Sequence, residues 1–267
     1  MGSLEGRVAL ITGASRGIGK GIALAMAKAG ADVAVNYVRN EQAGRQTVKE
    51  VEALGRKAIL VQADASKQEQ VKELVDRTAQ TFGKLDIVVA NGGNLITGSF
   101  FDDNAVDVFH SLMYTHVFGY FYTAKLAEPY LRQNKRSDII FISSLAAQQF
   151  WADEWAYATA KNAINALCKC IAKDANKYGM RVNCIGPSVV DTDMARKGFE
   201  GIIDIDAPET LKHVPYGRFI QPYDIGNLCV FLASEESFLI NGQVIYVDWG
   251  VGPGSIMSYI PTKGKRG

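Results

Sequence analysis

The stretch Thr12-Gly13-Ala14-Ser15-Arg16-Gly17-Ile18-Gly19 joins a short apolar run, Arg7–Ile11, to a segment of helical period. Its three glycines leave room for a backbone that turns tightly and approaches a phosphate. The helix that follows offers free N–H groups and its positive dipole end to that anion. A tight turn without a ligand is the alternative. The strand before the loop and the helix after it favour a nucleotide-phosphate site.

Short apolar strands and longer amphipathic helices alternate along the rest of the chain. Ile18, Ile22 and Met26 form one apolar stripe at helical spacing, and Val71, Leu74 and Val75 form another. Strands that are apolar without alternation are typical of a parallel sheet covered on both faces. We therefore predict an α/β fold: a Rossmann-like, doubly wound parallel sheet in a single domain. The predicted strands are Arg7–Ile11, Asp32–Asn36, Ala58–Gln62, Ile87–Ala90, Ile139–Ile142, Val182–Ile185 and Val244–Val247.

Two stretches depart from this alternation. Val189–Pro222 carries glycine, proline and scattered charge between regular regions, as active-site lids often do. The catalytic domain is predicted over residues 1–250, with a C-terminal tail, 251–267, that belongs to the same domain. Because this tail contains Pro253 and Pro261 and ends in basic residues, we expect it to be either mobile or pinned by a partner subunit.

Composition excludes several classes of function. The chain has 267 residues with 29 Lys plus Arg against 28 Asp plus Glu, and this balance argues against a nucleic-acid partner. The chain contains no run of 18 apolar residues, so no membrane span is predicted. Four cysteines without a CxxC pair and three histidines without an HExxH motif predict no metal site. With no signal-like N-terminus, we expect a cytoplasmic protein.

Tyr157-Ala158-Thr159-Ala160-Lys161 places a phenol and an ammonium on one face of a helix. A phenol with a pKa near ~10 is a poor base at neutral pH, and a nearby cation favours its ionised form. Such a pair suits general acid–base chemistry. Ser144 ends the apolar strand Ile139–Ile142, where its hydroxyl can hold the oxygen of a reacting carbonyl.

With these residues the chain resembles the short-chain dehydrogenase/reductase family over residues 6–250. The resemblance implies a nicotinamide cofactor and hydride transfer between it and a carbonyl or alcohol carbon. The matching motifs are TGASRGIG at 12–19, Asp64, Asn91-Gly92-Gly93, Ser144, Tyr157, Lys161, Asn183-Cys184-Ile185-Gly186-Pro187 with Thr192, and Asn241-Gly242-Gln243 with Asp248-Trp249-Gly250.

The resemblance also implies roles for single residues. Tyr157 would donate or accept the proton, Lys161 would lower the pKa of Tyr157 and hold the nicotinamide ribose, and Ser144 would orient the substrate oxygen. Asp64 would lie at the adenine and Asn91 would stabilise the central strand. The remaining implied residues, at the nicotinamide end, are Pro187 and Thr192.

Four positions depart from the family pattern. NNAG is replaced by Ala90-Asn91-Gly92-Gly93, Pro-Gly by Pro187-Ser188, and the final Asp-Gly-Gly by Asp248-Trp249-Gly250. His116 stands where the family has an asparagine that positions a relay water. We expect His116 to take this relay role and to add an ionisation to the rate between about pH 5.5 and 7.5. The alternative is a helix residue with a satisfied imidazole.

The end of the second strand decides the cofactor. An acidic residue there would bond the ribose of NAD and repel the 2′-phosphate of NADP. The chain instead has Asn36-Tyr37-Val38-Arg39-Asn40, with no carboxylate before Glu41. Arg16 and Arg39 suit a 2′-phosphate as donors, so NADP(H) is favoured over NAD(H). The alternative leaves both arginines as solvated surface residues.

The predicted function is an NADP-preferring alcohol dehydrogenase or carbonyl reductase. Aromatic residues such as Phe150, Trp151 and Trp155 favour a bulky or cyclic, partly apolar substrate, although such residues more often belong to a core. Two alternatives remain: a nucleotide-binding protein with little turnover, or a dehydratase or epimerase on the same site. The family resemblance implies a homotetramer. The predicted catalytic residues are Ser144, Tyr157, Lys161 and His116, and the predicted cofactor residues are Gly13, Ser15, Arg16, Gly17, Ile18, Gly19, Asn36, Tyr37, Arg39, Asp64, Ala65, Asn91, Gly92, Tyr157, Lys161, Pro187, Val190 and Thr192.

Overall fold

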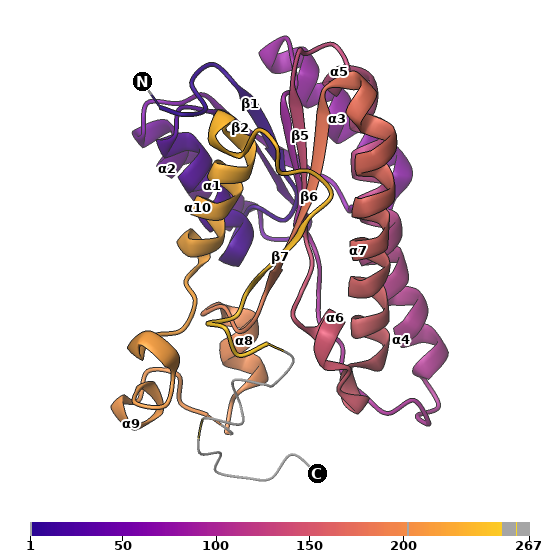
Figure 1. Cartoon of the computed structure of the whole chain (residues 1–267), viewed down its shortest axis with the longest axis vertical. Helices are drawn as coiled ribbons and strands as arrows, with labels where there is room; N and C mark the ends of the chain where they lie inside the picture. The colour runs from indigo at the N-terminus through magenta and orange to yellow at the C-terminus, as the bar shows by residue number, and fades with distance from the viewer. Residues whose placement is uncertain (1, 202, 253–259, 261–267) are drawn as a thin grey trace.

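A seven-stranded parallel sheet forms the centre of the computed structural model, which describes residues 2–201, 203–252 and 260 (Figure 1). The strand order is β3-β2-β1-β4-β5-β6-β7, and every neighbouring pair is parallel. The sheet therefore reverses its winding between β1 and β4. The strands are β1 (Val8–Ile11), β2 (Asp32–Tyr37), β3 (Ala58–Gln62), β4 (Ile87–Ala90), β5 (Ser137–Ile142), β6 (Met180–Pro187) and β7 (Val244–Val247).

Helices connect the strands by crossovers on both faces of the sheet. The α-helices are α1 (Gly17–Lys28), α2 (Glu41–Ala53), α3 (Gln68–Phe82), α4 (Ala105–Leu112), α5 (Gly119–Leu131), α6 (Ala146–Gln149), α7 (Trp155–Ala175), α8 (Asp193–Gly198), α9 (Pro208–Leu211) and α10 (Pro222–Ala233). A π-helix, η1 (Met113–Phe118), joins α4 to α5, and the 3₁₀ turns are η2 (Ala152–Glu154), η3 (Asn176–Tyr178), η4 (Pro215–Gly217) and η5 (Glu235–Ser237).

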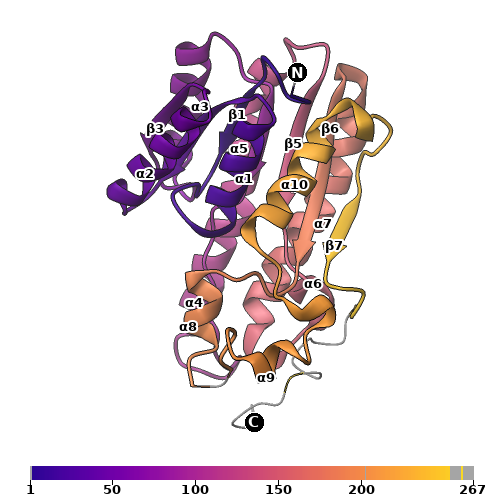
Figure 2. The same ribbon diagram turned by 90° about the vertical axis from the view of Figure 1, so that its left-hand side faces the viewer.

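The sheet divides the molecule into two apolar cores. On one face α3, α5 and α7 cover strand residues such as Leu10 and Phe141, and on the other face α1 and α10 cover residues such as Ile11 and Ile140. The two groups of helices lie on opposite sides of the strands in Figure 1, and Figure 2 shows α1 beside α10. Successive strand residues point to opposite faces, so both faces need apolar residues. This explains why the strands are apolar without alternation.

The structure confirms the predicted fold class and all seven predicted strands. The largest difference is β6, which runs over eight residues, because it lies inside the sheet and pairs along its length with β5 and β7. Arg181 and Asn183 interrupt its apolar run in the sequence. Both are nevertheless buried, and their side chains donate hydrogen bonds to the backbone carbonyl oxygen of Ile240. Polar residues of this kind conceal the ends of a strand from a hydrophobicity pattern.

The segment between β6 and α10 is less irregular than predicted, since it contains α8, α9 and η4. Its apolar side chains form a third, smaller cluster with Ile260. Of the predicted tail, the structure describes Val251, Gly252 and Ile260. The prediction that the tail is mobile or pinned by a partner therefore falls mostly outside the described residues.

Candidate active site

The glycine loop lies at the carboxyl end of β1, beside the point where the winding reverses. Gly13 has φ +64°, and a Cβ there would lie 2.8 Å from Cα of Gly92. A Cβ on Gly19 would lie 2.3 Å from the carbonyl oxygen of Gly13. Because these backbones approach so closely, the loop brings the start of α1 to the end of the sheet. This geometry fits the pyrophosphate of a dinucleotide.

Thr12 and Asn91 tie this loop to the end of β4. The Thr12 hydroxyl accepts hydrogen bonds from the backbone N–H groups of Asn91 (2.9 Å) and Gly92 (3.0 Å). In return the Asn91 side-chain amide donates to the carbonyl oxygen of Thr12 at 3.0 Å. The loop motif contains Thr12, but the sequence alone predicts no role for its hydroxyl. The sequence feature that could have indicated this contact is the presence of a threonine and an asparagine at the ends of two predicted strands, which are neighbours in the sheet.

Asn36 supports the loop from β2 with a fully engaged side chain. Its Oδ1 accepts from the backbone N–H of Gly13 at 3.0 Å, and its Nδ2 donates to the carbonyl oxygen of Ala63 at 2.9 Å. The side chain is buried, with 1% of the residue exposed. Asn36 therefore acts in this structure on the protein loop. Its neighbour Tyr37 is also buried, at 8% exposed.

Arg16 and Arg39 lie at the surface beside the glycine loop and the end of β2. Both are exposed, and within the described part of the chain neither guanidinium forms an ion pair. Glu41, the first carboxylate after β2, lies in the first turn of α2 and pairs with Arg45. The region thus offers two available cations, and its first carboxylate already has an arginine partner. The two guanidinium groups of this region fit a ligand that carries a 2′-phosphate.

Tyr157, Lys161 and Ser144 come together at the carboxyl end of β5. Tyr157 and Lys161 lie on one face of α7, and the Ser144 hydroxyl hydrogen-bonds the Tyr157 phenol. Lys161 is 3% exposed and donates from Nζ to the carbonyl oxygen of Ile142 at 2.8 Å. The hydroxyl of Tyr120 donates to the same carbonyl at 2.9 Å. Sequence reasoning missed Tyr120, because nothing in its sequence context separates it from ten other tyrosines.

Burial sets the pKa values of this pair. It raises the pKa of Tyr157, although the hydrogen bond from Ser144 acts in the opposite direction. Burial also lowers the pKa of Lys161 to about 7. In the ligand-free protein, burial therefore outweighs any lowering of the Tyr157 pKa by Lys161. Desolvation of the phenolate dominates, and the lysine itself loses charge near neutral pH.

His116 lies in the π-helix η1 and is 1% exposed. Its Nε2 lies 2.8 Å from the carbonyl oxygen of Asn94, so Nε2 carries the proton and Nδ1 is left as an acceptor. Nδ1 is buried and has no hydrogen-bond partner among the described residues. Burial and the charge of Lys161 lower the pKa of His116 well below its ordinary value. This direction acts against the predicted ionisation between about pH 5.5 and 7.5, because burial favours the neutral imidazole.

The remaining predicted cofactor residues lie at the same end of the sheet. Asp64 closes a turn after β3 by accepting from the N–H and the hydroxyl of Ser66. Ala65 contacts the start of α5, since a Cβ on Gly119 would lie 3.0 Å from the Ala65 carbonyl oxygen. The others, grouped around the glycine loop and the end of β6, are Ser15, Gly17, Ile18, Pro187, Val190 and Thr192.

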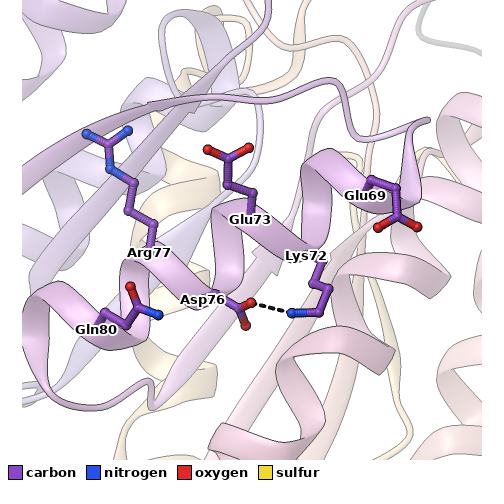
Figure 3. Close-up of a pocket in the computed structure, with 6 residues that line it drawn as sticks. All are labelled: Glu69, Lys72, Glu73, Asp76, Arg77 and Gln80. Carbon is purple, nitrogen blue, oxygen red and sulfur yellow. Dashed lines mark hydrogen bonds and ion pairs between the residues drawn. The ribbon is translucent and has the colours of Figure 1, made fainter.

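Aromatic residues that the sequence associated with the substrate lie elsewhere. Trp155 stacks on Phe109, with ring centroids 5.6 Å apart, and meets Phe100 edge to face. Together with Phe150 and Trp151 it lines a hollow on a different face of α7 from Tyr157. A second hollow, with charged and amide side chains that all belong to α3, shares no residue with the site (Figure 3). Neither hollow is the reaction centre.

Two negative findings concern the described residues alone. None of their helices is both long and apolar enough to cross a membrane. Within the same residues, no group of three or more His, Cys, Asp or Glu side chains is placed to hold a metal ion.

Comparison with known proteins agrees with this geometry. Residues 13–252 match the family described as enoyl-(acyl carrier protein) reductase. The chain is 32% identical to L-rhamnose 1-dehydrogenase (NAD(P)(+)) of Sphingomonas sp. (strain SKA58), over 93% of this chain and 97% of that protein. It is 36% identical to the hydroxynaphthalene reductase-like protein Arp2 of Metarhizium guizhouense (strain ARSEF 977), over 93% and 96%. A short chain dehydrogenase from Burkholderia cenocepacia J2315, solved in complex with NADP, is similar with a TM-score of 0.84 and 32% identity, over 95% of this chain and 100% of that chain.

The parallel sheet, the glycine loop and the grouping of Ser144, Tyr157 and Lys161 define a nucleotide-dependent oxidoreductase. The chain belongs to the short-chain dehydrogenase/reductase family. This confirms the resemblance found in the sequence. Proteins of this family use NAD(P)(H), and the residues described above fit such a cofactor.

Proposed function

We propose that the protein is an NADP(H)-preferring carbonyl reductase or alcohol dehydrogenase acting on a bulky or cyclic, partly apolar substrate. The observation that carries the proposal is the hydrogen bond between Ser144 and Tyr157, with Lys161 buried one helical turn further along α7. A hydroxyl and a phenol joined in this way are suited to hold one carbonyl oxygen between them.

The residues of the chain divide the chemistry among them. The cofactor, when bound, supplies or accepts a hydride. Ser144 orients the substrate oxygen, and Tyr157 donates a proton to that oxygen in the reductive direction. Lys161 is held by the Ile142 carbonyl and lies 5.4 Å from the centre of the Tyr157 ring. Where Lys161 is protonated, its positive charge favours the ionised phenol that remains after Tyr157 has given up its proton.

The raised pKa of Tyr157 supports the reductive direction near neutral pH. The phenol keeps its proton there and is ready to donate it. Oxidation of an alcohol needs the phenolate, which burial disfavours. We therefore propose reduction at neutral pH, with oxidation gaining as the pH rises.

His116 is proposed as a positioning residue beside Tyr157. Its neutral imidazole presents a buried acceptor at Nδ1, and the Lys161 ammonium is a buried donor close enough to shift its pKa. One water between these groups would satisfy the acceptor and connect the lysine to the interior. In this role the histidine holds a water without changing its own charge.

Support for the substrate class comes from names of relatives rather than from the aromatic residues. L-rhamnose and hydroxynaphthalene, named in two relatives, are ring compounds of different polarity. The support for NADP(H) is the pair of exposed arginines, Arg16 and Arg39, beside a loop with no available carboxylate.

The test is a panel of cyclic and acyclic ketones and secondary alcohols, scored by absorbance of the reduced nicotinamide with both cofactors. The proposal predicts turnover of cyclic ketones with NADPH above all other combinations. Turnover confined to small acyclic substrates would contradict the substrate class. Conversion of substrate without any absorbance change would contradict hydride transfer.

We also propose a homotetramer in the cytoplasm. Tyr114, Phe118 and Phe121 are at least 40% exposed on η1 and α5, and Phe100 and Phe101 are exposed on the loop before α4. Apolar side chains gathered on neighbouring helices suit contact between copies. Sedimentation at micromolar concentration tests the assembly, and a monomer there would contradict it.

A further inference from the structure

The segment between β6 and α10 forms a loop that is closed at its base. Val190 and Ile220 form a parallel bridge, and the Asp191 N–H donates to the Ile220 carbonyl oxygen at 2.8 Å. Within the loop Arg196 pairs with both Asp191 (2.8 Å) and Asp206 (2.5 Å). A loop whose ends are fixed together folds around its own side chains. What fills its interior therefore decides its shape.

This loop reaches the proposed cofactor site through the start of α8. Thr192 caps α8 by accepting from the Ala195 N–H at 3.3 Å. A Cβ added to Gly17 would meet Cγ2 of Thr192 at 3.4 Å, which is ordinary contact distance. Any displacement of α8 consequently changes the wall beside the glycine loop.

Side chains from beyond β7 fill the interior of the loop, and they include Trp249, Val251 and Ile260. Ile260 is 4% exposed and packs in the cluster formed by Phe199, Ile203, Ile205, Val214 and Phe219. Trp249 packs against this cluster and also against the core under α1 and α10, and its indole meets Phe219 edge to face at 6.3 Å. The loop alone does not complete its own apolar interior.

The backbone at Trp249 shows that this contact is maintained against strain. Its φ is +59°, a left-handed conformation that favours glycine. Asp248 holds the turn that follows Trp249, because its carboxylate accepts from the N–H groups of Gly250 and Gly252, each at 3.0 Å. A large side chain in this conformation is expected only where its contacts outweigh the strain.

We infer that Ile260 and Trp249 are positioning residues that hold the β6–α10 loop against the cofactor site. These two residues thereby set the affinity of the site for its ligands and leave the chemical step at Ser144 and Tyr157 unchanged. The effect on ligand affinity rests on the proposed function, whereas the effect on the loop does not.

The test measures the loop directly by limited trypsin digestion with mass spectrometry. Lys197, Lys212 and Arg218 are exposed cleavage sites in the loop. In Ile260→Ala, and in a chain that ends at Gly252, cleavage at these sites should accelerate at least about fivefold. Ile260→Val and a chain that ends at Ile260 should cleave like the wild type. Leu74→Ala, in the core under α3, is the matched control for general loss of stability.

Trp249→Gly separates packing from strain. Glycine removes the strain of the left-handed backbone. If the Trp249 side chain were merely tolerated there, the variant's loop should be cleaved more slowly or at an unchanged rate. The inference predicts faster cleavage. Wild-type cleavage rates in both Ile260→Ala and Trp249→Gly, or equal acceleration in Leu74→Ala, would overturn it.

Kinetics with NADPH and a substrate found in the panel complete the test. Ile260→Ala should raise KM about threefold or more for substrate or cofactor, while kcat stays within about twofold. A fall in kcat with KM unchanged would overturn the positioning role. If the wild type shows no turnover, the proposed function fails, and the digestion still decides whether the tail residues hold the loop.

Discussion

The imidazole of His116 meets the phenol ring of Tyr157 edge to face, with ring centroids 5.4 Å apart and ring planes at 83°. The contact is fixed because Nε2 of His116 is bonded to the Asn94 carbonyl. Gly93 packs directly against the imidazole, since a Cβ there would lie 2.3 Å from Cε1 of His116. The histidine is therefore locked between the end of β4 and the residue proposed to carry the proton.

Tyr157→Phe should abolish turnover while folding and cofactor binding persist. The change removes only the hydroxyl that Ser144 bonds and that the mechanism uses as proton donor. General acid–base groups contribute roughly 10²–10⁴ in rate, so we expect a loss of about a thousandfold in kcat. Tyr130→Phe, on the far part of α5, is the matched control and should retain activity. A Tyr157→Phe enzyme with more than a few per cent of wild-type activity would refute the assignment.

His116→Asn should give a pH–rate profile that superimposes on that of the wild type between about pH 5.5 and 7.5. The pKa of His116 is well below its ordinary value, so neither side chain changes charge in this range. His116→Ala should be slower than both, because it leaves a cavity beside Tyr157 and removes the acceptor at Nδ1. An additional ionisation in the wild type that His116→Asn erases would show that the imidazole titrates after all.

Lys161 should make the ligand-free protein more stable as the pH rises from about 7 to 10. Its pKa falls from 10.5 in the unfolded chain to about 7 in the fold, so the unfolded state binds more protons in this window. The full difference corresponds to on the order of 5 kcal/mol. Below pH 7 both states hold the proton, and this contribution stops changing.

Melting temperatures of wild type and Lys161→Met across this range isolate the effect. The melting temperature of the wild type should rise relative to that of Lys161→Met as the pH rises, because methionine does not titrate. Lys125→Met, which replaces an exposed lysine on α5, serves as the control. The difference in melting temperature between the wild type and Lys125→Met should show no such trend. A wild-type minus Lys161→Met difference that is constant from pH 6.5 to 10 would mean that the lysine pKa is not lowered.

The sequence predicted what depends on local spacing. The glycine loop, the phenol and lysine one turn apart on α7 and the order of strands and helices all follow from patterns of a few residues. Properties that depend on tertiary packing were beyond it. The pKa of Tyr157 depends on how much protein surrounds the phenol, and Trp155 stacks on Phe109, which lies 46 positions earlier in the chain.

Asn36 shows the same limit within the cofactor site. Its place after the second strand suggested contact with the cofactor, but the side chain turns inward to Gly13 and Ala63. The choice between the two directions depends on the register between β2 and β3, where Asn36 pairs with Val61. A single sequence does not reveal this register.

NADPH should bind more tightly than NADH, by one to two decades in Kd. Arg16 and Arg39 are exposed and unpaired within the described residues, so a 2′-phosphate would meet donors that give up no existing ion pair. A charge-assisted hydrogen bond contributes about 1.5–3 kcal/mol, and surface screening reduces this. Fluorescence titration at two salt concentrations measures the preference, which should shrink as salt is added.

Charge removal then identifies the arginine responsible. Arg16→Ala and Arg39→Ala should each weaken NADPH binding about tenfold and leave NADH binding nearly unchanged, because NADH lacks the phosphate. Arg45→Ala, an exposed arginine of α2 that pairs with Glu41, is the matched control and should leave both affinities as they are. If it weakened NADPH as much as the other two, the preference would come from the general positive potential of this surface rather than from a defined phosphate site. Equal wild-type affinities for NADPH and NADH would contradict the cofactor assignment itself, and the two exposed arginines would then be ordinary solvated side chains.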